Sequence, residues 1–389
     1  MFSKRTGWPL TPNRFTLAHR QLQAAGASIL DLTVSNPTNA GIVYDTKAIL
    51  ESLRDQRAMD YDPQPKGLLS ARQAVAAYYL EDHDVTVDPE SLVLTTSTSE
   101  GYSYILRLLC NPGDEVLVPK PSYPLFEFLA DLNDVKLVPY SLIYDHGWQI
   151  DFDSLTEAAT GRTRAVVMVH PNNPAGSFVT SSERTAINQF CRDRKLALIV
   201  DEVFLDYAHD GIHRDTFAGT RDALTFTLSG LSKISGLPQM KLAWIAATGP
   251  PDQVHAAIER LEVIADTYLS LNAPIQLACG VLLSERKKLQ PQLLERVRKN
   301  LEELDLQLAG QRSCTRLRGE GGWYVVLRVP VTRSDEDLAV DLLKDRSLLV
   351  HPGHFYDFAQ EGHLILSLIT PPTFFCDGVR RMLREINQP

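Results

Sequence analysis

The sequence has little cysteine and lacks long apolar runs, and both features exclude classes of protein. Five cysteines are scattered over 389 residues without a CxxC pair, so neither a disulfide framework nor a zinc site is indicated, and no metal is expected. No stretch approaches the ~20 apolar residues of a membrane span, and the N-terminus lacks the apolar segment of a signal peptide. We therefore expect a cytoplasmic protein with no membrane segment.

Positive charge is also scarce. Lys and Arg number 39 against 48 Asp and Glu, a formal net charge of -9, so no basic surface for nucleic acid or for an anionic membrane is indicated. The content of 44% hydrophobic and 22% charged residues is ordinary for a globular chain. An anionic small ligand would therefore need a local cationic site.

Short apolar runs alternate with helical patterns from about residue 66 onward. This alternation predicts an α/β domain with a mostly parallel sheet. The seven expected strands are residues 92–95, 115–119, 136–140, 165–170, 197–201, 223–228 and 243–248. After Pro274 a long charged helical stretch follows, in which Pro291 is expected to kink or restart the helix. Beyond it the pattern predicts a smaller α+β domain.

Polar residues directly follow three of these runs, at the sheet edge where open parallel sheets bind ligands. AVVMVH leads into PNNPAG, LALIV into DEVF, and ALTFTLS into GLSKISG, which places Asn173, Asp201 and Lys233 at strand ends. Each alone has an ordinary explanation, as a turn former, a helix cap or a solvated lysine. The three together indicate a ligand site.

The motifs HPNNPAG, DEVF and SGLSK resemble those of the class I and II, aspartate-aminotransferase-like, pyridoxal-phosphate (PLP) aminotransferases, and the likeness includes YDPQPKGLLSARQAVAAYY, LTTSTSEGYSYIL and NPGDEVLVPKPSYP. It implies a large PLP-binding domain with a seven-stranded sheet, residues 45–280, and a small α+β domain built from both chain ends. Residues 1–44 would form an N-terminal arm and part of the small domain, and residues 281–389 the rest of it. It also implies transfer of an amino group between a small-molecule amino donor and an oxo acceptor. A homodimer is implied too, in which Tyr61 reaches the partner's phosphate.

The resemblance assigns a role to each strand-end residue. Lys233 would hold the cofactor as a Schiff base and then act as general base and acid. Asp201 would keep the pyridine nitrogen protonated, so that the ring accepts electrons from the substrate carbon. Asn173 would donate a hydrogen bond to the ring 3-oxygen, and Tyr123 would stack on the ring face.

The cofactor phosphate is expected where Ser97, Thr98 and Ser99 begin a helix, because a helix N-terminus presents free N–H groups. An ordinary hydroxyl N-cap is the alternative interpretation. Lys241 stands where the family normally has a phosphate-binding arginine, and Ser229 and Ser232 are further candidate contacts.

Three other positions depart from the family pattern. Gly230 stands where a phosphate-binding serine is usual, and Phe204 stands where a tyrosine normally shares the ring 3-oxygen. Without that hydroxyl, the Schiff-base pKa should be less depressed than in relatives. In GHLILSL, Ile365 takes the position of an arginine, while Ser367 is retained.

The change at Ile365 bears on the substrate, because a carboxylate in a partly dry site needs a cation or several donors. One interpretation is that the substrate presents no carboxylate there. The other is that His363, His354, Asn36 and backbone N–H donors hold it more weakly. Arg328 is a candidate from an unaligned position, although an arginine within a strand is more often solvated. We expect poor use of aspartate, glutamate and alanine, and recognition through an apolar and aromatic pocket.

The remaining substrate candidates are Asn36 in DLTVSNPT, Trp323 in GGWY and His354 in HPGHFYDF. His351 and His354 lack a further ligand that would make a metal site. Two alternatives to an aminotransferase stay open: a PLP lyase or decarboxylase on the same scaffold, and a non-catalytic PLP-binding protein. A dehydrogenase is excluded, because no GxGxxG follows the first strand.

Overall fold

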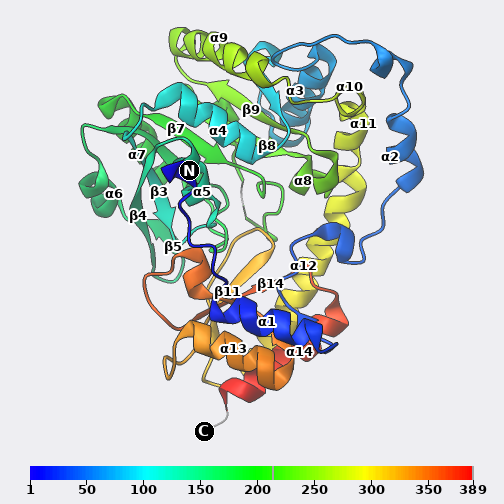
Figure 1. Cartoon of the computed structure of the whole chain (residues 1–389), viewed down its shortest axis with the longest axis vertical. Helices are drawn as coiled ribbons and strands as arrows, with labels where there is room; N and C mark the ends of the chain where they lie inside the picture. The colour runs from blue at the N-terminus through cyan, green and yellow to red at the C-terminus, as the bar shows by residue number, and fades with distance from the viewer. Residues whose placement is uncertain (213, 388–389) are drawn as a thin grey trace.

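The computed structural model describes residues 1–212 and 214–387, and it confirms an α/β fold built on a central, mostly parallel sheet (Figure 1). Within these residues the sheet has the strand order β2 (Leu92–Thr95), β9 (Ala243–Thr248), β8 (Thr225–Gly230), β7 (Ala197–Asp201), β6 (Thr163–Val169), β3 (Glu115–Lys120), β4 (Lys136–Tyr144) and β5 (Trp148–Ile150). The seven predicted strands are present, but the sheet has an eighth, β5. Strands β9 and β5 run antiparallel to their neighbours.

Helices cover both faces of this sheet, which explains why its strands are apolar on both sides. In β7, Ile199 packs toward α4 (Thr98–Leu109), α5 (Leu125–Leu132) and α9 (Pro251–Tyr268), whereas Leu198 and Val200 pack toward the opposite face. That face is covered by α2 (Thr46–Ser52), α3 (Leu69–His83), α6 (Phe152–Ala158), α7 (Ser181–Arg194), α8 (Leu231–Ile234), α10 (Ala273–Leu277) and α11 (Cys279–Ser284). A capping box of Thr180 and Glu183 begins α7.

The lower part of the molecule in Figure 1 is built from segments toward both ends of the chain, whereas the N-terminus itself lies higher, beside α5. Its elements are α1 (Arg14–Ala24), β1 (Leu30–Asp31), β10 (Thr315–Arg316), β11 (Tyr324–Arg328), α13 (Asp335–Arg346), β12 (Leu348–Leu349), β13 (His351–Pro352), β14 (His363–Ser367) and α14 (Pro372–Ile386). Strand β1 pairs with β12, and β10, β11, β14 and β13 form a second sheet in that order. Both chain ends therefore build this part, as the resemblance implied.

Helix α12 (Arg286–Ala309) connects the two parts and is the yellow helix on the right of Figure 1. It continues through Pro291, so the expected restart of the helix at this proline does not occur. Across residues 1–212 and 214–387, no helix has both the length and the apolar character needed to cross a bilayer.

Candidate active site

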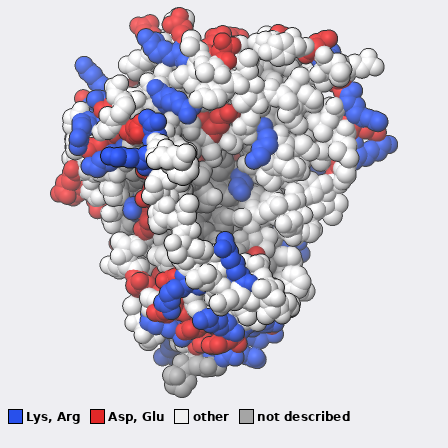
Figure 2. Space-filling model, viewed as in Figure 1, with Lys and Arg blue, Asp and Glu red and all other residues white. Residues whose placement is uncertain are grey.

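The carboxyl ends of the parallel strands open into a cavity of about 390 Å³ that is closed on its other side by residues of the chain ends. Figure 2 shows this face of the molecule hollowed near its centre. The cavity brings together Asn173, Asp201 and Lys233, which follow or end β6, β7 and β8. The three predicted strand-end residues thus share one site.

Lys233 lies in the short helix α8 and is held from several sides. The Tyr207 hydroxyl donates a 2.7 Å hydrogen bond to the Lys233 carbonyl oxygen. The Lys233 Nζ lies 4.9 Å from the centre of the Trp323 ring and 5.3 Å from that of Phe204. Burial lowers the pKa of this lysine to about 8, and the Asp201 carboxylate opposes the shift. About a tenth of the amine is therefore uncharged at pH 7, far more than at the ordinary pKa of 10.5, and able to act as a nucleophile.

Asp201 ends β7 and faces the same cavity. Its Oδ2 accepts a hydrogen bond from the Tyr102 hydroxyl at 3.2 Å, and its Oδ1 accepts from the Val203 N–H at 3.1 Å. Burial raises the pKa of Asp201 to about 6, while these two hydrogen bonds oppose the rise. A cationic group bound next to Asp201 would stabilise the carboxylate and lower its pKa again.

Asn173 is buried at the cavity wall, and its Oδ1 has no hydrogen-bond partner in the described part of the chain. Buried polar atoms without a partner are uncommon in folded proteins. The amide therefore has hydrogen-bonding capacity for a bound molecule.

The predicted phosphate site is the N-terminus of α4. Ser97 is its N-cap and accepts from the Glu100 N–H at 3.2 Å, so the capping interpretation is correct for this hydroxyl. Capping leaves the N–H groups of Thr98 and Ser99 without partners inside the helix, because they belong to its first turn. Both residues line the cavity. Capping and anion binding are therefore compatible here.

Lys241 and Ser232 line the same cavity, Lys241 with left-handed backbone (φ 51°). A side chain at Gly230 would meet the Ala243 Cβ at 2.8 Å and the Leu242 carbonyl oxygen at 2.9 Å, so close packing between β8 and β9 excludes a serine. Gly230 is thus explained by packing, and Ser232 is the hydroxyl residue beside it that reaches the cavity.

Four residues from the chain ends complete the cavity: Ser35, Tyr324, His351 and Tyr356. The His351 Nδ1 lies 3.1 Å from the Tyr356 hydroxyl and is hydrogen-bonded to it. Burial lowers the pKa of His351 to about 4, so the imidazole is neutral at physiological pH.

Four residues predicted to contact substrate are placed elsewhere. The Asn36 Oδ1 accepts from the Thr38 N–H at 3.1 Å, so Asn36 caps a local turn, while the preceding Ser35 faces the cavity. His354 is exposed, and Trp323 is fully buried beneath Lys233. Ile365, the fourth, is fully buried and does not line the cavity.

Ile365 lies in an apolar cluster with Leu317, Val326 and Tyr356, directly behind the cavity wall. Arg328 is exposed on β11, with its guanidinium 5.8 Å from the centre of the Tyr144 ring. Among the described residues that line the cavity, none is an arginine.

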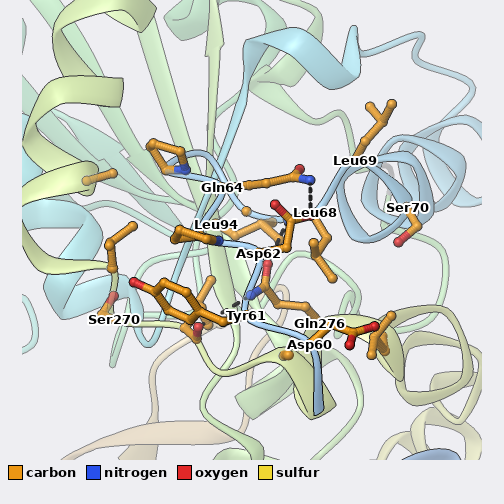
Figure 3. Close-up of a pocket in the computed structure, with 18 of the residues that line it drawn as sticks. Asp60, Tyr61, Asp62, Gln64, Leu68, Leu69, Ser70, Leu94, Ser270 and Gln276 are labelled. Carbon is orange, nitrogen blue, oxygen red and sulfur yellow. Dashed lines mark hydrogen bonds between the residues drawn. The ribbon is translucent and has the colours of Figure 1, made fainter. Parts of the chain in front are cut away.

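Tyr61 lies outside this cavity. Figure 3 shows it at a second pocket, of about 410 Å³, formed by a loop near residues 57–70 and by residues 265–277. Its side chain is 85% exposed, and the loop is anchored where the Leu68 N–H donates to the Gln276 Oε1 at 2.7 Å. Tyr61 is therefore available to a neighbouring molecule and not to the Lys233 site of its own chain.

Several residues of the site were not selected from the sequence: Ser35, Tyr102, Tyr207 and Tyr356. A signal existed for Tyr102, which follows Thr98 by four residues and so lies on the same helix face. Among the described residues, no group of three His, Cys, Asp or Glu side chains could hold a metal ion.

Comparisons with known proteins agree with this geometry. The sequence profile of aminotransferase class I and II matches residues 27–371. Glutamate-pyruvate aminotransferase AlaA of Haemophilus influenzae is 29% identical over 354 residues, which cover 88% of this chain and 87% of that protein. Alanine aminotransferase of Mycobacterium bovis is 29% identical over 364 residues, covering 90% and 83%.

Solved structures share the fold. An alanine aminotransferase from Pyrococcus furiosus superposes with a TM-score of 0.88 at 22% identity, covering 100% of both chains. An aminotransferase from Escherichia coli superposes with a TM-score of 0.87 at 24% identity, covering 99% of this chain and 98% of the other.

Proposed function

The chain belongs to the class I and II aminotransferases, and on that premise we propose that this transaminase uses pyridoxal phosphate bound at Lys233 to move an amino group between an amine donor and an oxo acceptor. The observation that carries the proposal is the meeting of Lys233, Asp201 and Asn173 with a helix N-terminus in one cavity. The names of the relatives do not fix the substrate.

When bound, pyridoxal phosphate supplies an aldehyde that takes up the amino group and a ring that stabilises negative charge on the substrate carbon. Lys233 would hold the aldehyde through its uncharged amine, and its free amine would move the proton at the substrate carbon. Asp201, held by Tyr102 and the Val203 N–H, would keep the proton on the ring nitrogen.

The other cavity residues orient the cofactor. Asn173 would hydrogen-bond the ring oxygen, and Tyr123 would pack against the ring face, since both line the cavity. The phosphate would be held by the first N–H groups of α4, and Lys241 and Ser232, which line the same cavity, would contribute.

We include a second copy of the chain in this proposal. Tyr61 is 85% exposed and Met59, two residues before it, is 88% exposed, so both side chains are available to a partner. In a homodimer, Tyr61 would reach the phosphate site of the partner. The free state of the five cysteines is compatible with the reducing cytoplasm.

The competing function is a lyase or decarboxylase, because these reactions need the same lysine and the same ring environment. They differ in the bond that breaks, and therefore in whether ammonia or carbon dioxide is released. No residue arrangement in the described chain favours either of them over amino transfer.

Borohydride reduction of the cofactor-loaded enzyme tests the proposal. Reduction should fix the cofactor to the peptide that contains Lys233, and Lys233→Ala should abolish labelling while leaving the fold intact. The other lysines of the chain serve as internal controls, because labelling at one of them would refute the assignment.

A further inference from the structure

The cavity wall formed by the chain ends carries hydroxyl groups but no positive charge. Its residues are Ser35, Tyr324, His351 and Tyr356. The lysines that line the cavity in the described chain are Lys233 and Lys241, and the proposed function assigns both to the cofactor. The part of the cavity that remains available to the substrate therefore carries no charged side chain.

The titratable groups of this wall keep that neutrality over the physiological range. Burial raises the pKa of Tyr324 and of Tyr356, and the proximity of Tyr123 adds to both shifts, so both phenols stay protonated. His351, hydrogen-bonded to Tyr356, is neutral because burial lowers its pKa to about 4. The wall thus offers neutral hydroxyl groups, each able to donate and to accept.

The layer behind the wall is apolar. Ile365, Val326 and Leu317 fill the space next to Tyr356 and Tyr324. Arg328 lies four residues along β11 from Tyr324, about 13 Å away at the usual rise of a strand, and packs over another ring. No cation of the described chain stands behind the hydroxyls to compensate a carboxylate.

We propose that the substrate of this enzyme carries an uncharged polar group, and no carboxylate, on the carbon that bears its amino group, as a 2-amino alcohol does. The proposal rests on the proposed function. A carboxylate buried against this wall would lose its hydration without gaining a cation, whereas a substrate hydroxyl matches the donors and acceptors of Tyr324, Tyr356 and Ser35. The relatives named above are named for glutamate, pyruvate and alanine.

The reaction balances without an outside oxidant. The amino nitrogen leaves the substrate carbon for the cofactor, Lys233 transfers the hydrogen of that carbon to the cofactor, and water supplies the oxygen of the new carbonyl group. A 2-amino alcohol thereby becomes a 2-hydroxy ketone. An oxo acceptor then receives the amino group by the same steps in reverse.

Matched pairs of amines test the inference on the cofactor-loaded enzyme. L-alaninol is compared with L-alanine, and L-phenylalaninol with L-phenylalanine, by the rate at which each removes the visible absorption of the lysine-bound cofactor. The amino alcohol should react at least about tenfold faster in at least one pair, because the wall is built for a hydroxyl.

Faster reaction of the amino acid in both pairs, equal rates, or no reaction of any amine would overturn the inference. These results are distinct from failure of the proposed function, which would appear as no borohydride-fixed cofactor at Lys233.

Two variants test the wall itself. Tyr356→Phe and Tyr324→Phe remove one hydroxyl each and should lower the ratio of the alaninol rate to the alanine rate about tenfold. Tyr268→Phe, on a half-exposed α9 tyrosine that does not line the cavity, is the matched control. An unchanged alaninol-to-alanine ratio in both wall variants would overturn the assignment of the hydroxyls.

Discussion

The hydroxyl of Tyr207 donates a 2.7 Å hydrogen bond to the backbone carbonyl oxygen of Lys233. Tyr207 is fully buried, and its ring lies edge-on to Trp323 with 4.9 Å between ring centres. Because Trp323 also lies under the Lys233 amine, the two aromatic residues hold both the backbone and the side chain of the lysine. The position of the nucleophile therefore depends on residues that do not touch the substrate.

Tyr207→Phe should slow the reaction with amines about tenfold, because small misplacements of a reacting group are costly. The free energy of unfolding should fall by about 1 kcal/mol through loss of one hydrogen bond. Tyr140→Phe is the control, since the buried Tyr140 also donates to a carbonyl oxygen, that of Val167, at 2.9 Å. Equal loss of rate in both variants would show that the effect is one of stability alone.

Cofactor incorporation into the apoenzyme should depend on pH through Lys233. The uncharged amine reacts, so the rate should rise with pH and level off above about 8, the pKa of this lysine. Asp201→Asn removes the charge that raises this pKa, and it should move the midpoint to lower pH. Stopped-flow absorbance between pH 6 and 10 measures both. A midpoint near the ordinary lysine value of 10.5 would contradict the account.

Lys241 should contribute to cofactor affinity as a point charge. Lys241→Ala should weaken binding by about 1 to 3 kcal/mol, the scale of a hydrogen bond to a charged group. Lys241→Arg should keep or improve affinity, because guanidinium binds phosphate bidentately. Lys195→Ala is the control, since Lys195 is also an exposed lysine with left-handed backbone, at the end of α7. Full affinity in Lys241→Ala would show that this lysine does not contact the phosphate.

Glu202 should make the apoprotein less stable as pH rises. Its carboxylate accepts from the Thr216 hydroxyl and the Phe217 N–H, both at 2.6 Å, yet burial raises its pKa from 4.5 to about 7. The folded state therefore binds the proton more tightly, and this stability, present below pH 4.5, is lost as pH rises through about 7.

In the unmodified protein, Glu202 should lower the free energy of unfolding by roughly 3 kcal/mol between pH 4.5 and 8, the size expected when its pKa rises from 4.5 to about 7 on folding. Glu202→Gln should abolish this fall. Urea unfolding of both apoproteins across this range measures the difference. The same pH slope in the two proteins would contradict the account.

The strand-end residues could be predicted because an apolar run and the polar residue after it are both local in sequence. Parallel strands then bring Asn173, Asp201 and Lys233 to one edge of the sheet. Strand β5 could not be predicted in this way, because three residues carry too little periodicity. Its place is set by antiparallel pairing with β4.

The substrate wall was harder to predict, because side-chain direction there depends on tertiary packing. Asn36 was chosen from its motif, but a local turn uses its side chain and turns Ser35 to the cavity. The HPGHFYDF motif favours His354 as the substrate contact, whereas the structure exposes His354 and places His351 in the cavity beside Tyr356.

The most direct test of the account is a stepwise amino transfer by the cofactor-loaded enzyme, first with a reactive amine and no acceptor, then with an oxo compound. We predict that the amine removes the visible absorption of the lysine-bound cofactor with one carbonyl product formed per site, and that the oxo compound restores it. No ammonia or carbon dioxide should appear. Sustained release of ammonia or of carbon dioxide without an acceptor would show that the enzyme is a lyase or decarboxylase and would contradict the account.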